Sequence, residues 1–208
     1  AVMLVRELLE PFARDAGAEV ESRSDRAGRL GSTVIATWSG DRATAGGPSL
    51  LLIGHMDTVF DAGTAAERPF SIDAEGIARG PGVTDMKSGL LAGLYAMRAL
   101  VARGPLPFER VTFVANPDEE IGSPTSTPHI RAIAAESDVC LVLECARANG
   151  DIVSSRKGIL DAKVTVHGRA AHAGGCRLGN DVGVRQGEAR TEPEDEGARE
   201  WSPPASKR

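Results

Sequence analysis

Short apolar segments alternate with longer amphipathic segments through most of this chain. Residues 49–53, 110–115 and 139–143 are apolar runs with the length of buried β-strands. Between them, residues 86–103 and 127–135 repeat apolar side chains at the three- and four-residue steps of an α-helix. This alternation predicts an α/β fold with a mostly parallel sheet flanked by helices.

The segments on either side extend this pattern. Residues 1–14 predict an amphipathic helix, and residues 18–20 and 33–38 predict two more strands. Two later runs with strand character, residues 151–155 and 160–168, either return to the edge of the sheet or begin a second domain. We therefore expect one α/β domain followed by part of another.

Composition excludes several classes of protein. A net charge of -5 and an aromatic content of 4% provide neither the positive surface nor the stacking platforms of a nucleic-acid-binding protein. No apolar run approaches the roughly 20 residues of a membrane-spanning helix. The spacing of the three cysteines, Cys140, Cys145 and Cys176, fits neither a disulfide scaffold nor a metal site, so we expect a cytoplasmic protein. The chain begins at Ala1, which leaves open a secretion signal that has been lost.

Residues of the kind that bind metals follow each of the three buried runs. Because the carboxyl ends of parallel strands form the ligand crevice of an open α/β sheet, we expect these residues to converge. Asp85 joins them, since it precedes the helix at 86–103 and follows a Gly-Pro-Gly turn. The residues at the strand ends are His55, Asp57, Asp118, Glu119, Glu120 and Glu144.

Such a cluster of carboxylates favours a metal centre. Like charges at close range oppose each other's ionisation unless cations neutralise them. One imidazole with several carboxylates suits Zn²⁺, with Co²⁺ or Mn²⁺ as substitutes, and favours two ions that share one aspartate. On a strand, Asp57 would lie on the same side as His55 and orient its ring. Of the adjacent Glu119 and Glu120, one can bind metal while the other takes a proton from water.

Five motifs carry a resemblance to a known family. They resemble, in order and spacing, the zinc amidohydrolase family of glutamate carboxypeptidases, aminoacylases, acetylornithine deacetylases and succinyl-diaminopimelate desuccinylases. The resemblance covers residues 1–174 and is greatest to the glutamate carboxypeptidase branch. The motifs are GHMDTVF at 54–60, GPGVTDMKSG at 80–89, PDEEIGS at 117–123, LECARANGDIVSSRKG at 143–158 and GRAAHAG at 168–174.

The resemblance implies a role for each matching residue. It implies that the peptide bond after Asp85 is cis, and that the chain is an incomplete zinc-peptidase catalytic domain. The implied metal ligands are His55 and Glu144 for the first zinc, Glu120 for the second zinc, and Asp85 as the bridge between them. The implied catalytic residues are Glu119 as general base, Asp57 as the residue that orients the histidine, and His172.

The resemblance also implies a reaction and its partners. Water activated by zinc and by Glu119 would attack the amide bond of a small peptide or an N-acyl amino acid. His172 matches a lid-domain histidine that helps to bind the substrate carboxylate and to polarise the scissile carbonyl, commonly across the interface of a homodimer. Neither a nucleic acid nor a membrane is an expected partner.

The chain departs from the family pattern in two places. Cys145 stands where relatives usually have proline, and the motifs stop after Gly174. No histidine follows His172, so the last ligand of the second zinc is missing, and we expect a frame-shifted or truncated gene product. The expected parts are a partial catalytic domain at 1–157, the start of a lid or dimerisation domain at 158–175, and an unmatched, disordered tail at 176–208.

An alternative hypothesis places the chain in a different functional class. Residues 176–208 carry 13 charged side chains but only four large apolar ones, too few to build a core. With the final histidine and half of the crevice absent, the chain would be a catalytically inactive metal-binding fragment. Metal stoichiometry and turnover distinguish this hypothesis from an active hydrolase.

Overall fold

A computed structural model describes residues 2–24, 30–41, 46–145, 149–155, 158, 169–171 and 181–183. The chain divides into two units, Ala1–Asp151 and Ile152–Arg208. The expected ligands from His55 to Glu144 all belong to the first unit. That unit therefore carries the whole of the cluster predicted from the strand ends.

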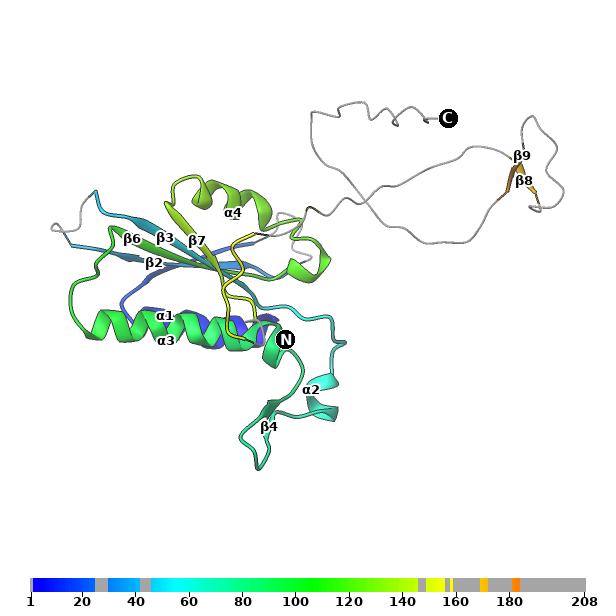
Figure 1. Ribbon diagram of the computed structural model, residues 1–208, viewed down its shortest axis with the longest axis horizontal. Coiled ribbons are helices and arrows are strands. Elements are labelled where there is room, and N and C mark those ends of the chain that lie inside the picture. Colours follow the sequence, from blue (N-terminus) through cyan, green and yellow to red (C-terminus); the bar gives the residue numbers. More distant parts are fainter. Residues whose placement is uncertain are drawn as a thin grey trace. The chain divides into compact units, whose positions relative to one another are not determined.

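A five-stranded sheet forms the centre of the first unit, with strand order β1-β2-β6-β3-β7 (Figure 1). Strands β6, β3 and β7 are parallel, while β1 and β2 extend the sheet in antiparallel fashion. The expected α/β sheet is thus confirmed, and its parallel part is the part that ends in acidic residues. The strands are β1 (Glu19–Arg23), β2 (Thr33–Ser39), β3 (Ser49–His55), β6 (Arg110–Asn116) and β7 (Val139–Val142).

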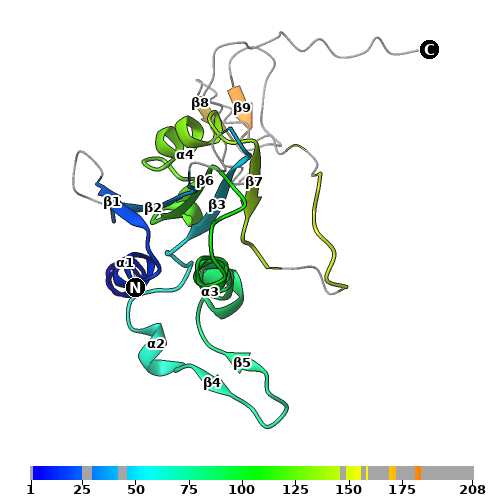
Figure 2. The same ribbon diagram turned by 90° about the vertical axis from the view of Figure 1, so that its left-hand side faces the viewer.

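Helices cover both faces of this sheet (Figure 2). Helices α1 (Val2–Asp15) and α3 (Ser88–Ala102) lie on one face, and α4 (Thr127–Ala134) lies on the other. All three occupy the segments in which the sequence predicts helices. The apolar periodicity therefore located the three helices.

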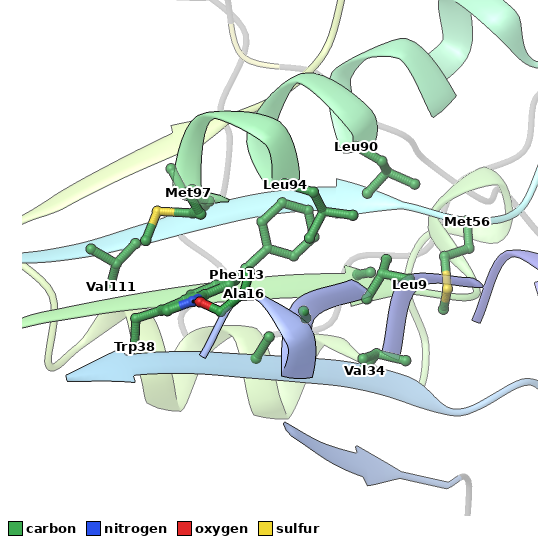
Figure 3. Close-up of a cluster of buried hydrophobic side chains, with 14 of the residues drawn as sticks. Leu9, Ala16, Val34, Trp38, Met56, Leu90, Leu94, Met97, Val111 and Phe113 are labelled. Carbon is green, nitrogen blue, oxygen red and sulfur yellow. Dashed lines mark hydrogen bonds between the residues drawn. The ribbon is translucent and has the colours of Figure 1, made fainter. Parts of the chain in front are cut away.

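The larger part of the core lies between the sheet and helices α1 and α3 (Figure 3). Leu90, Leu94 and Met97 of α3 are at most 3% exposed and pack with Phe113 of β6. Trp38 is also buried, and its Nε1 donates a hydrogen bond of 2.8 Å to the carbonyl of Ala16. A smaller cluster on the opposite face packs Ile35, Leu51 and Val114 against α4.

Two glycines of α3 allow the helix to approach the chain that leads to Glu144. A Cβ placed on Gly89 would lie 1.7 Å from the backbone oxygen of Leu143, and one on Gly93 would lie 2.6 Å from the Leu143 side chain. Real Cβ atoms do not come this close to a neighbour, so larger residues would force the segments apart. The close packing thereby places the residue before Glu144.

Two expectations about the later strands are wrong. The run at 139–143 was expected to be buried, but Val139, Leu141 and Val142 of β7 are 45%, 42% and 61% exposed. The reason is that β7 pairs only with β3 among the described residues and forms an edge of the sheet. Residues 151–155 form no strand and are exposed, with Ile152 at 90%. The run at 160–168 lies outside the described residues.

A turn-rich arm connects β3 to α3 and projects beyond the helices (Figure 2). Its elements are α2 (Thr64–Glu67), the hairpin strands β4 (Ser71–Ile72) and β5 (Ala78–Arg79), and the π-helical turn η2 (Val83–Lys87). A second short turn, η3 (Glu119–Ile121), follows β6. The two turns hold the acidic motifs at 80–89 and 117–123.

The second unit is described only in short pieces. Strands β8 (Arg169–Ala171) and β9 (Asp181–Gly183) pair in parallel, so the stretch at 176–208 contains a strand. His172 and Cys176 lie outside the described residues, as does most of the expected lid segment 158–175. In the part of the chain that the structure describes, no helix is both long and apolar enough to cross a bilayer.

Candidate metal centre

The ends of three adjacent parallel strands bring the expected ligands together. His55 is the last residue of β3 and lies opposite Asn116, the last residue of β6. The amide of Met56 donates to the carbonyl of Asn116 at 2.8 Å, and the amide of Leu143 donates to that of Ile53, also at 2.8 Å. The chains that lead to Asp57, Glu119 and Glu144 therefore leave the sheet side by side.

The imidazole of His55 lies at the centre of the cluster and is only 1% exposed. Its Nε2 lies 2.9 Å from Oδ1 of Asp85, 3.5 Å from Oε1 of Glu144 and 3.9 Å from Oε2 of Glu119. The opposite nitrogen, Nδ1, faces Asp57, at 3.3 Å from Oδ1 and 3.1 Å from its backbone oxygen. Each ring nitrogen thus has an acidic partner.

Asp57 also connects the loop after β3 to the loop after β6. Its Oδ2 accepts a hydrogen bond of 2.9 Å from the backbone amide of Glu120. One carboxylate therefore touches both the ring of His55 and the backbone that carries Glu120. This contact explains why a His-x-Asp motif and a Glu-Glu motif far apart in sequence share one site.

The turn at η2 presents Asp85 to His55. The peptide bond between Asp85 and Met86 is cis, which confirms the expectation drawn from the family resemblance. Met86 is buried at 1% exposure, and its sulfur accepts a hydrogen bond of 3.1 Å from the backbone amide of His55. The turn is therefore anchored beneath β3, with the Asp85 carboxylate 60% exposed on the outer side.

Asp118 has a different role from the two glutamates that follow it. Its side chain is fully buried and accepts hydrogen bonds from Thr125 Oγ1 and Ser126 Oγ at 2.7 and 2.6 Å. It also accepts from the backbone amides of Thr125 and Ser126, at 2.7 and 3.2 Å. Asp118 fixes the loop after β6, whereas the sequence had placed it with the convergent acids. The signal was the run of Ser and Thr at 123–127, whose hydroxyls suit a buried carboxylate.

The crowding of charges shifts several pKa values. Although burial opposes protonation of His55, its hydrogen bonds with Asp57 and Asp85 and the negative charges of Asp57 and Glu119 raise its pKa to about 9. Burial and neighbouring carboxylates raise the pKa values of Glu119 and Glu120. Burial also acts to raise the pKa of Asp57, but hydrogen bonds from His55 and the Glu120 amide lower it. Glu119 and Glu120 therefore resist ionisation without an added cation.

The donor atoms fit a metal ion. One ligand atom from each of His55, Asp85 and Glu120 lies within 4.8 Å of the others. Oε1 of Glu120 is buried and has no hydrogen-bond partner within the described ranges. A buried carboxylate oxygen without a donor is costly, and a cation beside the imidazole and Asp85 would satisfy it.

A sequence comparison identifies the family. The profile described as "Peptidase family M20/M25/M40" matches residues 51–195. The chain belongs to this family. The M20 match confirms the resemblance drawn from the motifs, and it continues past Gly174, where those motifs stop.

Individual M20 relatives resemble the chain over part of their length. Carboxypeptidase G2 of Pseudomonas sp. (strain RS-16) is 34% identical over 168 residues, which are 80% of this chain and 39% of that protein. The succinyl-diaminopimelate desuccinylase of Methylobacterium nodulans is 35% identical over 142 residues, 63% of this chain and 36% of that protein. The chain thus spans less than half the length of these relatives.

Solved structures show the same fold. Aminopeptidase PepT from Bacillus cereus ATCC 10987 superposes with a TM-score of 0.56 at 22% identity, over 69% of this chain and 38% of its own. The M20 metallo-carboxypeptidase Sso-CP2 from Sulfolobus solfataricus gives 0.53 at 19% identity, over 70% and 33%. The helix-flanked mixed sheet is therefore the fold of these peptidase structures.

Proposed function

We propose that the protein is a zinc-dependent hydrolase that cleaves the amide bond of a small peptide or an N-acyl amino acid. The observation that carries this proposal is the convergence of one buried imidazole with five carboxylates, in a member of the M20 family. The relatives include proteins named as a carboxypeptidase and a desuccinylase, which supports hydrolysis of a terminal peptide or acyl group.

The chain supplies most of the ligands for two ions. We assign His55 and Glu144 to the first ion, Glu120 to the second, and Asp85 to both. Imidazole and carboxylate together suit Zn²⁺, and Co²⁺ or Mn²⁺ would substitute. When bound, zinc supplies Lewis acidity and lowers the pKa of water.

Glu119 is the residue best placed to move protons. Its carboxylate is 49% exposed and lies 3.9 Å from Nε2 of His55, so it borders the site while remaining open to solvent. Burial and the charges of Glu144, Asp57 and Asp85 raise its pKa, which brings it closer to the working pH of a general base. Glu119 accepts a proton from the attacking water and passes it to the leaving nitrogen.

Asp57 orients the histidine. A proton on Nδ1 of His55 is held between the side chain and the backbone oxygen of Asp57, which leaves Nε2 free to bind metal. The same carboxylate holds the Glu120 amide. Asp57 thereby fixes the ligands of both ions relative to each other.

The substrate side of the reaction rests on the family resemblance. We assign His172 the binding of the substrate carboxylate and the polarisation of the scissile carbonyl, across the interface of a homodimer. The resemblance is greatest to the glutamate carboxypeptidase branch, which favours the release of a C-terminal amino acid from a peptide. A cytoplasmic location agrees with the absence of disulfide spacing among the three cysteines.

Turnover and metal content test the proposal together. The zinc-loaded protein should hydrolyse N-acyl amino acids or glutamyl dipeptides, and a chelator should abolish that activity. Glu119→Gln should retain zinc but lose turnover by at least about 100-fold, whereas Glu120→Gln should lose metal. Equal zinc loss in both variants would contradict the assignment of base and ligand. Tight zinc binding without turnover would favour the alternative of an inactive metal-binding fragment.

A further inference from the structure

The backbone amide of His55 points away from the neighbouring strand β6. The next amide along the chain, that of Met56, donates to the carbonyl of Asn116 at the end of β6. Successive amides of a strand point to opposite sides of it, so the amide of His55 points to the side on which β7 lies. It needs an acceptor on that side, because His55 is buried and an unpaired buried amide is costly.

A sulfur atom takes the place of the next strand carbonyl on that side. β7 pairs with β3 as far as Ile53, whose carbonyl accepts from the amide of Leu143 at 2.8 Å. The amide of His55 lies two residues further along and donates to the sulfur of Met86 at 3.1 Å. Met86 belongs to the turn η2 and is 1% exposed, so water does not compete for this amide. The thioether thus completes the hydrogen bonding of β3 where its pairing with β7 ends.

Gly54 gives the side chain of Met86 room to reach this amide. A Cβ placed on Gly54 would lie 2.8 Å from the terminal methyl carbon of Met86 and 2.7 Å from Cδ2 of Leu90. Real Cβ atoms do not come this close to a neighbour. Met86 and Leu90 therefore fill the space that a side chain at position 54 would take, and the thioether is held across the strand one residue before His55.

Two consecutive residues of η2 are attached to the same histidine. Met86 accepts the backbone amide of His55, and Oδ1 of Asp85 lies 2.9 Å from Nε2 of the ring. The Asp85 side chain is 60% exposed, so packing does little to hold it. The buried Met86 next to it provides the anchor. The separation of the two proposed ligands His55 and Asp85 thus depends on the contact between a sulfur and an amide.

We propose that Met86 is a positioning residue whose sulfur, by accepting the His55 amide, holds Asp85 and His55 at the separation that a bound metal ion requires. This inference rests on the proposed function, because it takes both residues as metal ligands. An aliphatic side chain of similar size would fill the space beside Gly54 but leave the amide of His55 without its acceptor. The amide would then turn to another acceptor, and the turn that carries Asp85 would shift. Loss of the sulfur should therefore weaken metal binding beyond its effect on the fold.

Two matched variants of the full chain test this role. Met86→Leu removes the sulfur from the turn, and Met97→Leu makes the same change at a buried residue of α3 in the larger core (Figure 3). Both variants should unfold about 2–4 °C below the parent chain, because each changes the shape of one buried side chain. In competition with a chromophoric chelator, Met86→Leu should bind Zn²⁺ about tenfold more weakly, whereas Met97→Leu should keep the parent affinity.

Norleucine separates the effect of the sulfur from that of side-chain shape. Its biosynthetic incorporation replaces the sulfur of each methionine, Met3, Met56, Met86 and Met97, with a methylene group. It should lower the zinc affinity of the parent chain about tenfold and leave that of Met86→Leu unchanged, because the effect comes from position 86 alone. In the metal-free parent chain, norleucine should also make the amide of His55 exchange faster with solvent.

The outcomes separate the role of Met86 from the proposed function. Equal zinc affinities of Met86→Leu and Met97→Leu, or a norleucine effect of the same size in the parent and in Met86→Leu, would show that Met86 is only a packing residue and overturn the inference. An unchanged exchange rate of the His55 amide would overturn it too, because the sulfur would then not be the acceptor. Absence of zinc binding in the parent chain would instead refute the proposed function, and the inference would fall with it.

Discussion

Asp118 should be essential for stability and dispensable for metal binding, although it lies next to the proposed base. Its fully buried carboxylate accepts hydrogen bonds from two hydroxyls and two backbone amides. Hydrogen bonds to a charged group contribute about 1.5–3 kcal/mol each, and their sum overstates the effect because the loop can relax. Asp118→Asn retains the shape but loses the charge, so we expect unfolding to become easier by about 2–3 kcal/mol. Asp118→Ala leaves the donors unpaired and should cost about 3–5 kcal/mol.

The pH dependence of this effect has a defined sign. Hydrogen bonds from Ser126 and Thr125 lower the pKa of Asp118 despite its burial. A carboxyl group whose pKa is lower in the folded state stabilises the protein above its unfolded pKa of about 3.9. That contribution is lost as the pH falls through the folded value. The stability difference between the parent and Asp118→Asn should therefore be complete at pH 7 and shrink below about pH 4.

Urea denaturation of the metal-free protein at pH 7 and pH 3, with zinc competition on the same samples, measures both quantities. Ser123→Ala serves as a control, because the Ser123 hydroxyl contacts Asn116 at 3.3 Å but does not contact Asp118. A normal urea midpoint for Asp118→Asn combined with lost zinc affinity would refute the reasoning. Asp118 would then be a ligand and not a support for the loop.

Other substitutions test the remaining contacts of the site. Asp57→Ala should weaken zinc binding about 10–100-fold without abolishing it, because Asp57 holds His55 and the Glu120 amide without binding the ion. Competition with a chelator measures this affinity. Complete loss of zinc binding would make Asp57 a ligand. Gly89→Ala should destabilise the chain by about 1–3 kcal/mol in urea, because its Cβ would meet the backbone oxygen of Leu143, whereas the exposed neighbour Ser88→Ala should change stability little. Unchanged stability of Gly89→Ala would mean that α3 does not press on Leu143.

The sequence predicted those parts of the molecule that depend on local pattern. Apolar periodicity located α1, α3 and α4, and the apolar runs located β3, β6 and β7. The carboxyl ends of parallel strands meet at one edge of a sheet, so the positions of His55, Glu119 and Glu144 after these runs predicted that the three side chains converge. The cis bond after Asp85 came from the resemblance alone, since nothing in the residue types around it predicts such a bond.

The parts that the sequence did not predict depend on long-range contacts. An apolar run such as VCLVL looks the same whether neighbours cover it or it forms an edge, so the exposure of β7 was missed. Asp118 and Glu119 are adjacent acidic residues that the sequence pattern does not distinguish. The path of the loop after β6 turns Asp118 inward to Ser126.

The position of Glu144, a proposed metal ligand, after the edge strand has a consequence for how an ion would leave the proposed site. β7 is a four-residue strand that pairs only with β3 among the described residues, while His55 ends a strand paired on both sides. Edge strands open by local fluctuation far more often than central strands. Opening of β7 would withdraw Glu144 and leave His55 and Asp85 in place. The residence time of an ion at this site would then depend on how often the edge strand opens and not on global unfolding of the domain. Amide hydrogen exchange at Leu141 and Leu143 measures that opening.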